Sequence, residues 1–192
     1  MKKNIIFLFV AFVTIMLPSC NYNRIIRQQE TVEMSWSEVE NQYQRRMDLI
    51  PNLVSTVKGY ASHEQETLTG VIEARAKATS VTIDATNMTE EQLANYQKAQ
   101  GDVTNALSKL MMVTEAYPQL RANENFLELQ AQLEGTENRI SVARRNFNKS
   151  VRQYNNTIRS FPTLIYAGWF GFTTKPYFQA DEGAKDAPKV EF

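Results

Sequence analysis

A stripe of core-type residues from Phe126 to Phe161 constrains the fold more than any other feature of this chain. The stripe advances 35 residues in ten steps, a mean of 3.5, which is the period of a helix packed along a bundle seam and not of a strand. At about 1.5 Å per residue it is about 50 Å long, so we expect equally long helices beside it. Thr136 is its one polar member. The stripe comprises Phe126, Leu129, Leu133, Thr136, Ile140, Ala143, Phe147, Val151, Tyr154, Ile158 and Phe161.

A second stripe predicts another long helix in the first third of the chain, where helical patterning begins near Ile25. Its members are Val32, Trp36, Val39, Tyr43, Met47, Ile50, Val54 and Val57. Pro51 falls inside this stripe and lacks the amide that would bond the carbonyl of Met47. The helix either kinks there or restarts with Asp48 as its N-cap. Because the stripe stays in phase across the proline, we favour the kink.

Capping boxes predict where the two middle helices begin. Ser62-His63-Glu64-Gln65 opens a segment that continues through Leu68, Val71, Ile72, Ala74, Ala76 and Ala78. Thr89-Glu90-Glu91-Gln92 opens the next helix, whose core stripe is Leu93, Tyr96, Val103, Leu107, Leu110 and Tyr117, with polar Gln100 and Thr114 at seam positions. We expect Pro118 to end that helix, Asn123 to cap the long last helix and Pro162 to terminate it.

The chain begins with Lys2 and Lys3, followed by an apolar run from Ile5 to Leu17. Thirteen residues are fewer than the ~20 of a spanning helix but match the ~7 to 15 of a signal-peptide core. Residues 1–19 are therefore interpreted as a leader that is removed during export. Leu17-Pro18-Ser19-Cys20 resembles the lipobox of bacterial lipoproteins, in which the cysteine is acylated and becomes the N-terminus. The alternatives are an ordinary buried thiol at Cys20 and an uncleaved signal anchor.

The predicted anchor places the protein in the cell envelope, held to a membrane through its N-terminal lipid and facing the periplasm. Cys20 is the only cysteine, so no intrachain disulfide forms although the leader implies an oxidising compartment. Asn21, and no acidic residue, follows Cys20, which favours the inner leaflet of the outer membrane.

Charge argues against a nucleic-acid partner. The whole chain has 21 basic and 21 acidic side chains, and loss of Lys2 and Lys3 with the leader leaves 19 and 21, a formal charge of −2. Binding to phosphate backbones requires a net basic face. The pairs Arg45-Arg46 and Arg144-Arg145 are interpreted as solvated helix faces.

Two blocks of the sequence are similar to the LemA family. The first comprises Trp36-Ser37, residues 45–54, Val57-Lys58-Gly59-Tyr60 and His63-Glu64. The second comprises Tyr117-Pro118, Arg121-Ala122-Asn123, Asn125-Phe126, Leu129-Gln130, Leu133-Glu134, residues 136–140, Ala143-Arg144, Tyr154-Asn155, Phe161-Pro162 and residues 187–190. Many LemA-like proteins keep an N-terminal membrane helix, so the lipobox is a departure from the pattern.

The resemblance implies a long antiparallel four-helix bundle, the all-α fold class that the stripes indicate independently. We assign the bundle to residues 20–162 and an irregular, aromatic-rich tail to residues 163–192. The tail aromatics are Trp169, Phe170, Phe172, Tyr177 and Phe178. We expect them to cover one end of the bundle; a membrane-interface role and a partner-docking patch are the alternatives.

Residue chemistry predicts no catalytic, cofactor or metal site. His63 is the only histidine, and Thr67 stands where a zincin motif needs its second histidine. A di-iron bundle needs Glu three residues before the histidine, and Tyr60 is there. The resemblance implies an envelope protein without established catalytic activity, often encoded beside membrane metalloproteases. We therefore interpret the protein as a non-enzymatic scaffold or interaction module with an envelope partner; the alternative is an enzyme with an unrecognised site in the bundle.

The last three residues, Val190-Glu191-Phe192, form a candidate recognition signal. Two apolar side chains spaced by one residue and a free carboxylate suit strand addition to a sheet edge. The alternative is a frayed or simply packed terminus.

Overall fold

The computed structural model describes residues 2–179, with side chains from Tyr22 onward. Its elements are the α-helices α1 (Lys2–Tyr60), α2 (Gln65–Ser80), α3 (Glu90–Thr114), α4 (Pro118–Arg121), α5 (Glu124–Arg159) and α6 (Thr163–Tyr166), and the 3₁₀ helix η1 (Gly168–Phe170). No strand occurs in the described part of the chain, and the all-α prediction is confirmed.

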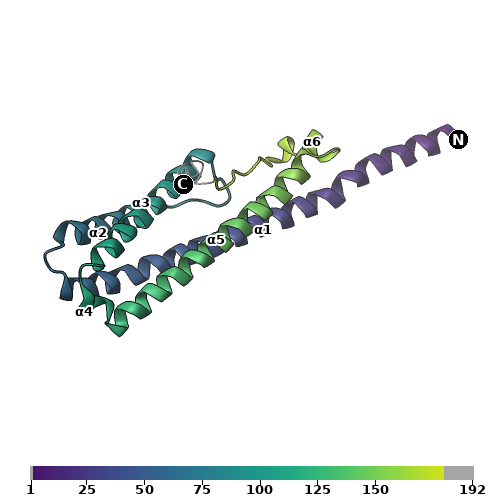
Figure 1. Cartoon of the computed structure of the whole chain (residues 1–192). Coiled ribbons are helices and arrows are strands. Elements are labelled where there is room, and N and C mark those ends of the chain that lie inside the picture. The colour runs from purple at the N-terminus through teal and green to yellow at the C-terminus, as the bar shows by residue number, and fades with distance from the viewer. Residues whose placement is uncertain (1, 180–192) are drawn as a thin grey trace, which may run out of the picture.

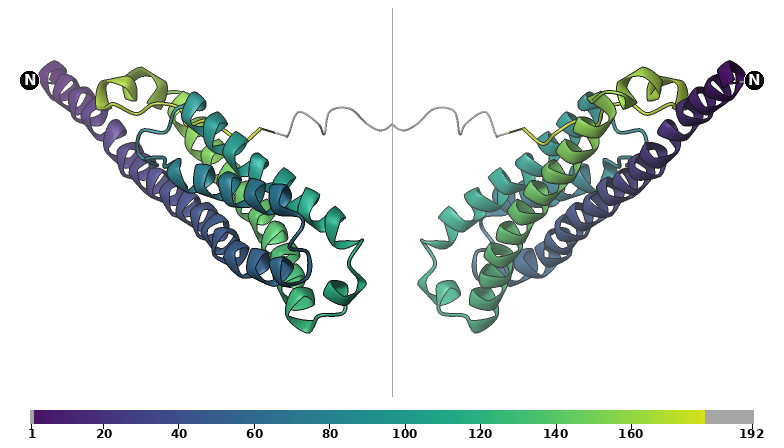
Figure 2. Two further views of the ribbon diagram at one scale, coloured as in Figure 1. Left: turned by 90° about the vertical axis from the view of Figure 1, so that its left-hand side faces the viewer. Right: turned by 90° about the vertical axis from the view of Figure 1, so that its right-hand side faces the viewer.

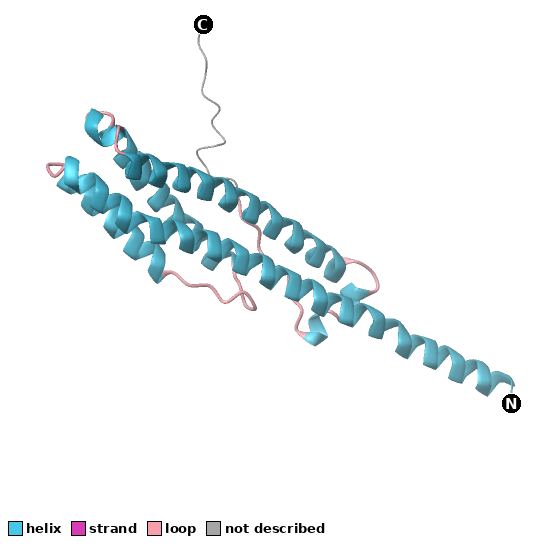
Figure 3. Ribbon diagram, turned by 90° about the horizontal axis from the view of Figure 1, so that it is seen from below, coloured by secondary structure: helices cyan, strands magenta, loops and turns pink. Residues whose placement is uncertain are grey.

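The four longest helices, α1, α2, α3 and α5, alternate in direction along an elongated bundle (Figures 1 and 3). Contacts fix the antiparallel pairing of α1 with α5: the hydroxyl oxygens of Ser35 and Ser150 lie 2.8 Å apart, and Arg46 lies 2.7 Å from Glu137. In the α2–α3 hairpin, Lys77 Nζ lies 2.7 Å from Asp102. The N-terminal part of α1 projects beyond one end of the bundle, which we call the anchor end, while α4 lies at the opposite, far end (Figure 1).

The helices are less equal in length than the sequence predicts. Helices α1 and α5 have 59 and 36 residues, whereas α2 and α3 have 16 and 25. The α2–α3 hairpin therefore covers the far half of the α1–α5 pair. Two irregular segments, residues 81–89 and 171–179, cover the remainder (Figure 2).

The buried apolar side chains form two clusters along the bundle. The cluster nearer the anchor end contains Ile25 to Tyr43 of α1 and Ile140 to Ile158 of α5. The cluster at the far end contains Met47 to Val57 of α1 and Phe126 and Leu133 of α5. All members of the predicted α1 stripe are buried.

The α5 stripe is confirmed except at two positions. Leu129 is only partly buried, and Phe161 is 83% exposed. Phe161 departs from the stripe because α5 ends at Arg159, just before Pro162, which cannot continue a helix. In α2, Ile72 is likewise exposed. The polar seam residues Gln100 and Thr114 of α3 and Thr136 of α5 are buried.

Helix boundaries follow the predicted caps with one exception. The amide of Gln92 donates to Thr89 Oγ1 at 3.2 Å, and the amide of Phe126 donates to Asn123 Oδ1 at 3.0 Å, so both caps are confirmed. The Ser62 capping box is wrong: α2 begins after Glu64, which makes no side-chain cap bond. The Glu64 carboxylate instead accepts a hydrogen bond from the hydroxyl of Tyr117 at 3.0 Å.

Candidate functional site

Arg46 joins three helices between the two apolar clusters. Its side chain is 1% exposed. Nη1 donates to Thr104 Oγ1 at 2.8 Å and to Glu137 Oε1 at 2.7 Å, while Nη2 donates to Gln100 Oε1 at 2.7 Å and to the Gln100 carbonyl at 3.0 Å. The guanidinium also lies 5.1 Å from the ring centroid of Tyr43. The solvated-face interpretation of Arg45-Arg46 is therefore wrong for Arg46, because the fork of Arg reaches acceptors on α3 and α5 at once.

Arg75 of α2 supplies the hydrogen bond that Pro51 cannot. Helix α1 is continuous across Pro51, so the restart at Asp48 is wrong. The Met47 carbonyl lacks an intrahelical donor there because proline has no amide hydrogen. Nε of Arg75 donates to that carbonyl at 2.9 Å. The hydrogen bond that the proline removes from α1 is thus replaced by one from α2, which attaches the two helices to each other.

The tail runs back along the bundle and pairs with two asparagines of α5. Asn155 Nδ2 donates to the Lys175 carbonyl at 2.8 Å, and Asn155 Oδ1 accepts from the Lys175 amide at 2.9 Å. Asn148 makes the same pair of bonds with Phe178, at 3.0 and 2.9 Å. Each carboxamide thus bonds the tail backbone as a neighbouring strand would. We call this arrangement the tail clasp.

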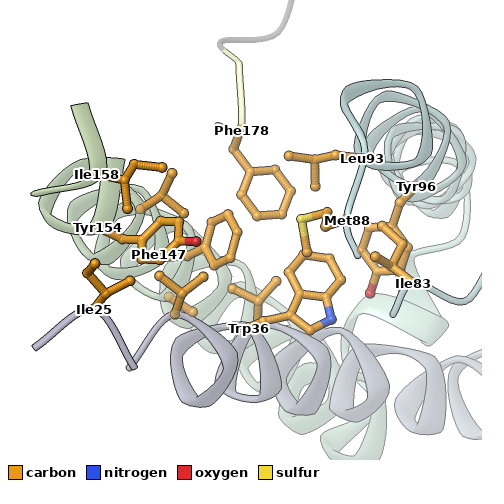
Figure 4. Close-up of a cluster of buried hydrophobic side chains, with 14 of the residues drawn as sticks. Ile25, Trp36, Ile83, Met88, Leu93, Tyr96, Phe147, Tyr154, Ile158 and Phe178 are labelled. Carbon is orange, nitrogen blue, oxygen red and sulfur yellow. The ribbon is translucent and has the colours of Figure 1, made fainter. Parts of the chain in front are cut away.

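Phe178 anchors the tail clasp in the core. Its ring stacks on Trp36 at a centroid distance of 5.9 Å and meets Phe147 edge-on at 5.5 Å (Figure 4). Arg144 covers the outer face of the Phe178 ring at 4.8 Å, and Arg144 Nη2 and Gln97 Nε2 both donate to the Gln179 carbonyl, at 3.0 and 2.9 Å. The tail therefore closes the space between α3 and α5.

Lys175 ties the tail to the loop over residues 81–89. It is buried, and its Nζ donates to the carbonyls of Ala85, at 3.1 Å, and Thr86. Burial lowers the pKa of Lys175, and the negative charges of Glu33 and Asp84 oppose that shift.

The two asparagines, Arg75 and Lys175 were not predicted from the sequence. Asn148 and Asn155 are seven residues apart, and each follows an aromatic core residue, Phe147 or Tyr154. A repeated aromatic–asparagine pair on one helix face was therefore an available signal for a polar ladder beside the core. No comparable local signal marks Arg75 or Lys175, because their partners are backbone carbonyls on other elements.

Helix α6 and η1 form a short projection at the anchor end, where the tail begins. Tyr166 and Ala167 are buried and hold it to the bundle, and Gly171, with φ 78°, turns the chain into the extended tail. The prediction that tail aromatics cover the bundle end is wrong for Phe178, which is buried along the side of the bundle, and for Trp169 and Phe170, which are exposed. The exposed apolar residues of this region form what we call the apolar collar: Phe161, Leu164, Ile165, Trp169 and Phe170.

The remaining predicted residues occupy separate places. Cys20 lies within α1, and its side chain is outside the described ones. His63 is exposed in the turn between α1 and α2, and Val190 to Phe192 lie beyond the described residues. Across residues 2–179 no helix has both the length and the apolar character needed to cross a membrane. Among the side chains described from Tyr22 to Gln179, no group of three or more metal-ligating residues gathers.

The structure defines the class of protein: it is an elongated helical bundle whose first helix projects beyond one end and whose tail is clasped along one side. The sequence profile of the LemA family matches residues 35–192. The chain belongs to the LemA family.

Sequence similarity to known proteins extends over most of the chain. Protein LemA of Metamycoplasma hominis is 24% identical over 160 residues, which cover 83% of this chain and 69% of that protein. Magnetosome protein MamQ of Magnetospirillum gryphiswaldense is 27% identical over an alignment of 198 positions, covering 94% of this chain and 72% of the relative. Magnetosome protein MamQ 1 of Paramagnetospirillum magneticum matches with the same identity and coverage.

Proposed function

We propose that this LemA-family protein is a membrane-anchored envelope protein that acts as a non-enzymatic scaffold or interaction module. The observation that carries the proposal is the continuity of α1. One helix runs from Lys2 to Tyr60, so Cys20 and the bundle core belong to the same element. A lipid attached at Cys20 therefore also orients the bundle after the leader is removed.

The anchor we propose is acylated Cys20, with the bundle in the periplasm and attached to the outer membrane. Its support is the sequence Leu17-Pro18-Ser19-Cys20 after a short apolar run. Two or more acyl chains hold a protein stably, whereas one is marginal at about 0.8 kcal/mol per buried CH₂. Cys20→Ala should leave an unacylated precursor that a fatty-acid probe no longer labels. Labelling equal to wild type would contradict the lipid anchor.

The partner we propose is another envelope protein, with membrane proteases as one class. The far end of the bundle, where the turn between α1 and α2 holds His63, lies away from the anchor and is suited to reach such a partner (Figure 1). A photo-crosslinking residue placed at His63 in living cells should capture a discrete protein. The matched control places it at Lys149, which is exposed on the flank of α5. Capture at both positions alike, or at neither, would contradict a specific far-end partner.

The terminus Val190-Glu191-Phe192 is proposed as a second recognition element. The tail clasp supports the idea because it fixes the Gln179 carbonyl, the point from which the last thirteen residues continue. Deleting the three residues should abolish partner capture without changing helix content or melting temperature. If capture survives, the terminus is not the docking element; a lower melting temperature would assign it to the packed domain.

The non-enzymatic part of the proposal has a direct test. Elemental analysis of protein purified from its own membrane should find no stoichiometric transition metal. A metal retained at one equivalent would favour an enzyme with an unrecognised site.

A further inference from the structure

The apolar collar is exposed although the rest of its segment is packed. Phe161 and Trp169 are 83% and 82% exposed, and the other three members are more than half exposed. Their neighbours Thr163, Tyr166 and Ala167 are buried. The fold therefore holds this segment in place while turning its largest apolar side chains outward, which marks an interaction surface.

Tyr22 fixes the position of the collar relative to Cys20. Its ring lies 5.3 Å from that of Phe170 and 5.6 Å from that of Phe172. Tyr22 is two residues after Cys20 on the same helix, a rise of about 3 Å. The collar thus lies close to the residue proposed to carry the lipid, and a lipid that holds Cys20 at a membrane brings the collar to the headgroup region.

The charged side chains next to the collar are basic. Residues 22–29 contain two basic and no acidic side chains, and residues 156–172 contain one basic side chain, Arg159, and no acidic one. The first acidic residue of α1 is Glu30. Arg24, Arg27 and Arg159 of these segments are exposed. An open hollow of about 520 Å³ next to the collar is lined by Arg24, Gln28, Asn156 and Phe161, among others. Exposed aromatic rings beside exposed arginines match the headgroup region of an anionic bilayer.

We propose that the apolar collar is a lipid-docking surface that inserts at the headgroup level of an anionic membrane. Its ring and aliphatic side chains enter the interface, and Arg24, Arg27 and Arg159 face lipid phosphates. The collar gives the bundle a second membrane contact beside α1, which restricts its tilt. This inference rests on the proposed membrane anchoring.

The two tryptophans provide an internal test. Trp169 is in the collar, whereas Trp36 is 1% exposed in the bundle core. The full chain, purified from its own membrane, is reconstituted into vesicles of phosphatidylglycerol with phosphatidylcholine. A fraction of the lipid is brominated on the acyl chain near the headgroup, so that it quenches nearby indoles.

We expect brominated lipid to remove the Trp169 emission and to leave the Trp36 emission. The Trp169→Phe variant keeps an aromatic ring in the collar and should show almost no quenching. Leu164→Glu combined with Ile165→Glu changes only exposed positions, so it should keep the helix content and restore most of the Trp169 emission. Quenching should also be weaker in vesicles of phosphatidylcholine alone.

Flotation of the vesicles separates the two claims. A chain that floats with unquenched Trp169 overturns the collar proposal, while membrane anchoring stands. A chain that does not float overturns both claims. Equal quenching with and without phosphatidylglycerol overturns the role of the arginines.

Discussion

Arg46 shows how much one side chain can organise in this bundle. It is a charged residue buried where α1, α3 and α5 meet, and its four hydrogen bonds reach Gln100, Thr104 and Glu137. Burying a charge is costly unless it is hydrogen-bonded, and here both Nη atoms are bonded while Nε has no partner. Arg46 therefore favours one register of the three helices over the shifted alternatives that apolar packing alone would tolerate.

Replacing Arg46 with lysine should lower the free energy of unfolding by about 2 kcal/mol, because an ammonium cannot bond acceptors on both sides of the fork and leaves Gln100 or Thr104 without a charged donor. Glu137→Gln, which keeps an oxygen acceptor for Nη1 of Arg46, should cost less than about 1 kcal/mol, since the Glu137 side chain is 42% exposed. Urea denaturation followed by circular dichroism measures both. Equal losses in the two variants would contradict a buried register-fixing role.

Tyr96 should make the bundle sensitive to alkali. Burial, reinforced by Tyr43 and Glu40, raises the pKa of Tyr96 well above its ordinary value. An unfolded tyrosine releases its proton near pH ~10, whereas the folded protein retains it. Above that pH the unfolded state binds fewer protons, so stability that is fully present below pH ~10 is lost as the pH rises toward the folded pKa.

Tyr96→Phe removes this difference in proton binding. The free energy of unfolding of the variant should therefore fall less steeply than that of wild type between about pH 9 and about pH 11. Urea titrations at several pH values give the two slopes. Parallel slopes would show that Tyr96 ionises as readily in the folded protein as in the unfolded chain.

Among the helices, α2 is attached to α1 where Pro51 leaves the Met47 carbonyl without an amide donor. If Arg75 stabilises the protein by bonding the Met47 carbonyl, Arg75→Met should cost about 1 kcal/mol in the wild-type background. It should cost clearly less in a Pro51→Ala background, where the restored amide competes for the same carbonyl. A double-mutant cycle from urea denaturation measures the coupling. Additive effects would mean that Arg75 acts through something other than this carbonyl.

The hydrogen bonds of the tail clasp should stabilise the fold. Asn155→Ala should lower the free energy of unfolding by about 1 to 3 kcal/mol, because it leaves the buried amide and carbonyl of Lys175 without partners. Hydrogen exchange over residues 173–179 should accelerate. The neighbouring Asn156→Ala is the matched control, since Asn156 is exposed. Unchanged exchange in Asn155→Ala would show that Phe178 alone holds the tail.

For the molecule as a whole, the sequence predicted the positions of the helices better than the contacts between them. The stripes in α1 and α5 and the caps at Thr89 and Asn123 were legible because periodicity and capping are local. The clasp and the burial of Arg46 depend on elements distant in sequence. Phe161 continues the α5 spacing, yet the turn before Pro162 moves it into the collar, and spacing alone carries no sign of that.

We propose that the protein stands on a membrane with the collar at the lipid surface and the far end turned toward a partner. Leu164 in the collar and Leu127 at the start of α5 are 62% and 50% exposed, and α5 separates their ends of the bundle by about 50 Å. Photo-crosslinking residues at these two positions in living cells, analysed by mass spectrometry, test the orientation directly. We expect lipid adducts at Leu164 and protein adducts without lipid at Leu127. Protein adducts without lipid at Leu164, or lipid adducts at Leu127, would contradict it.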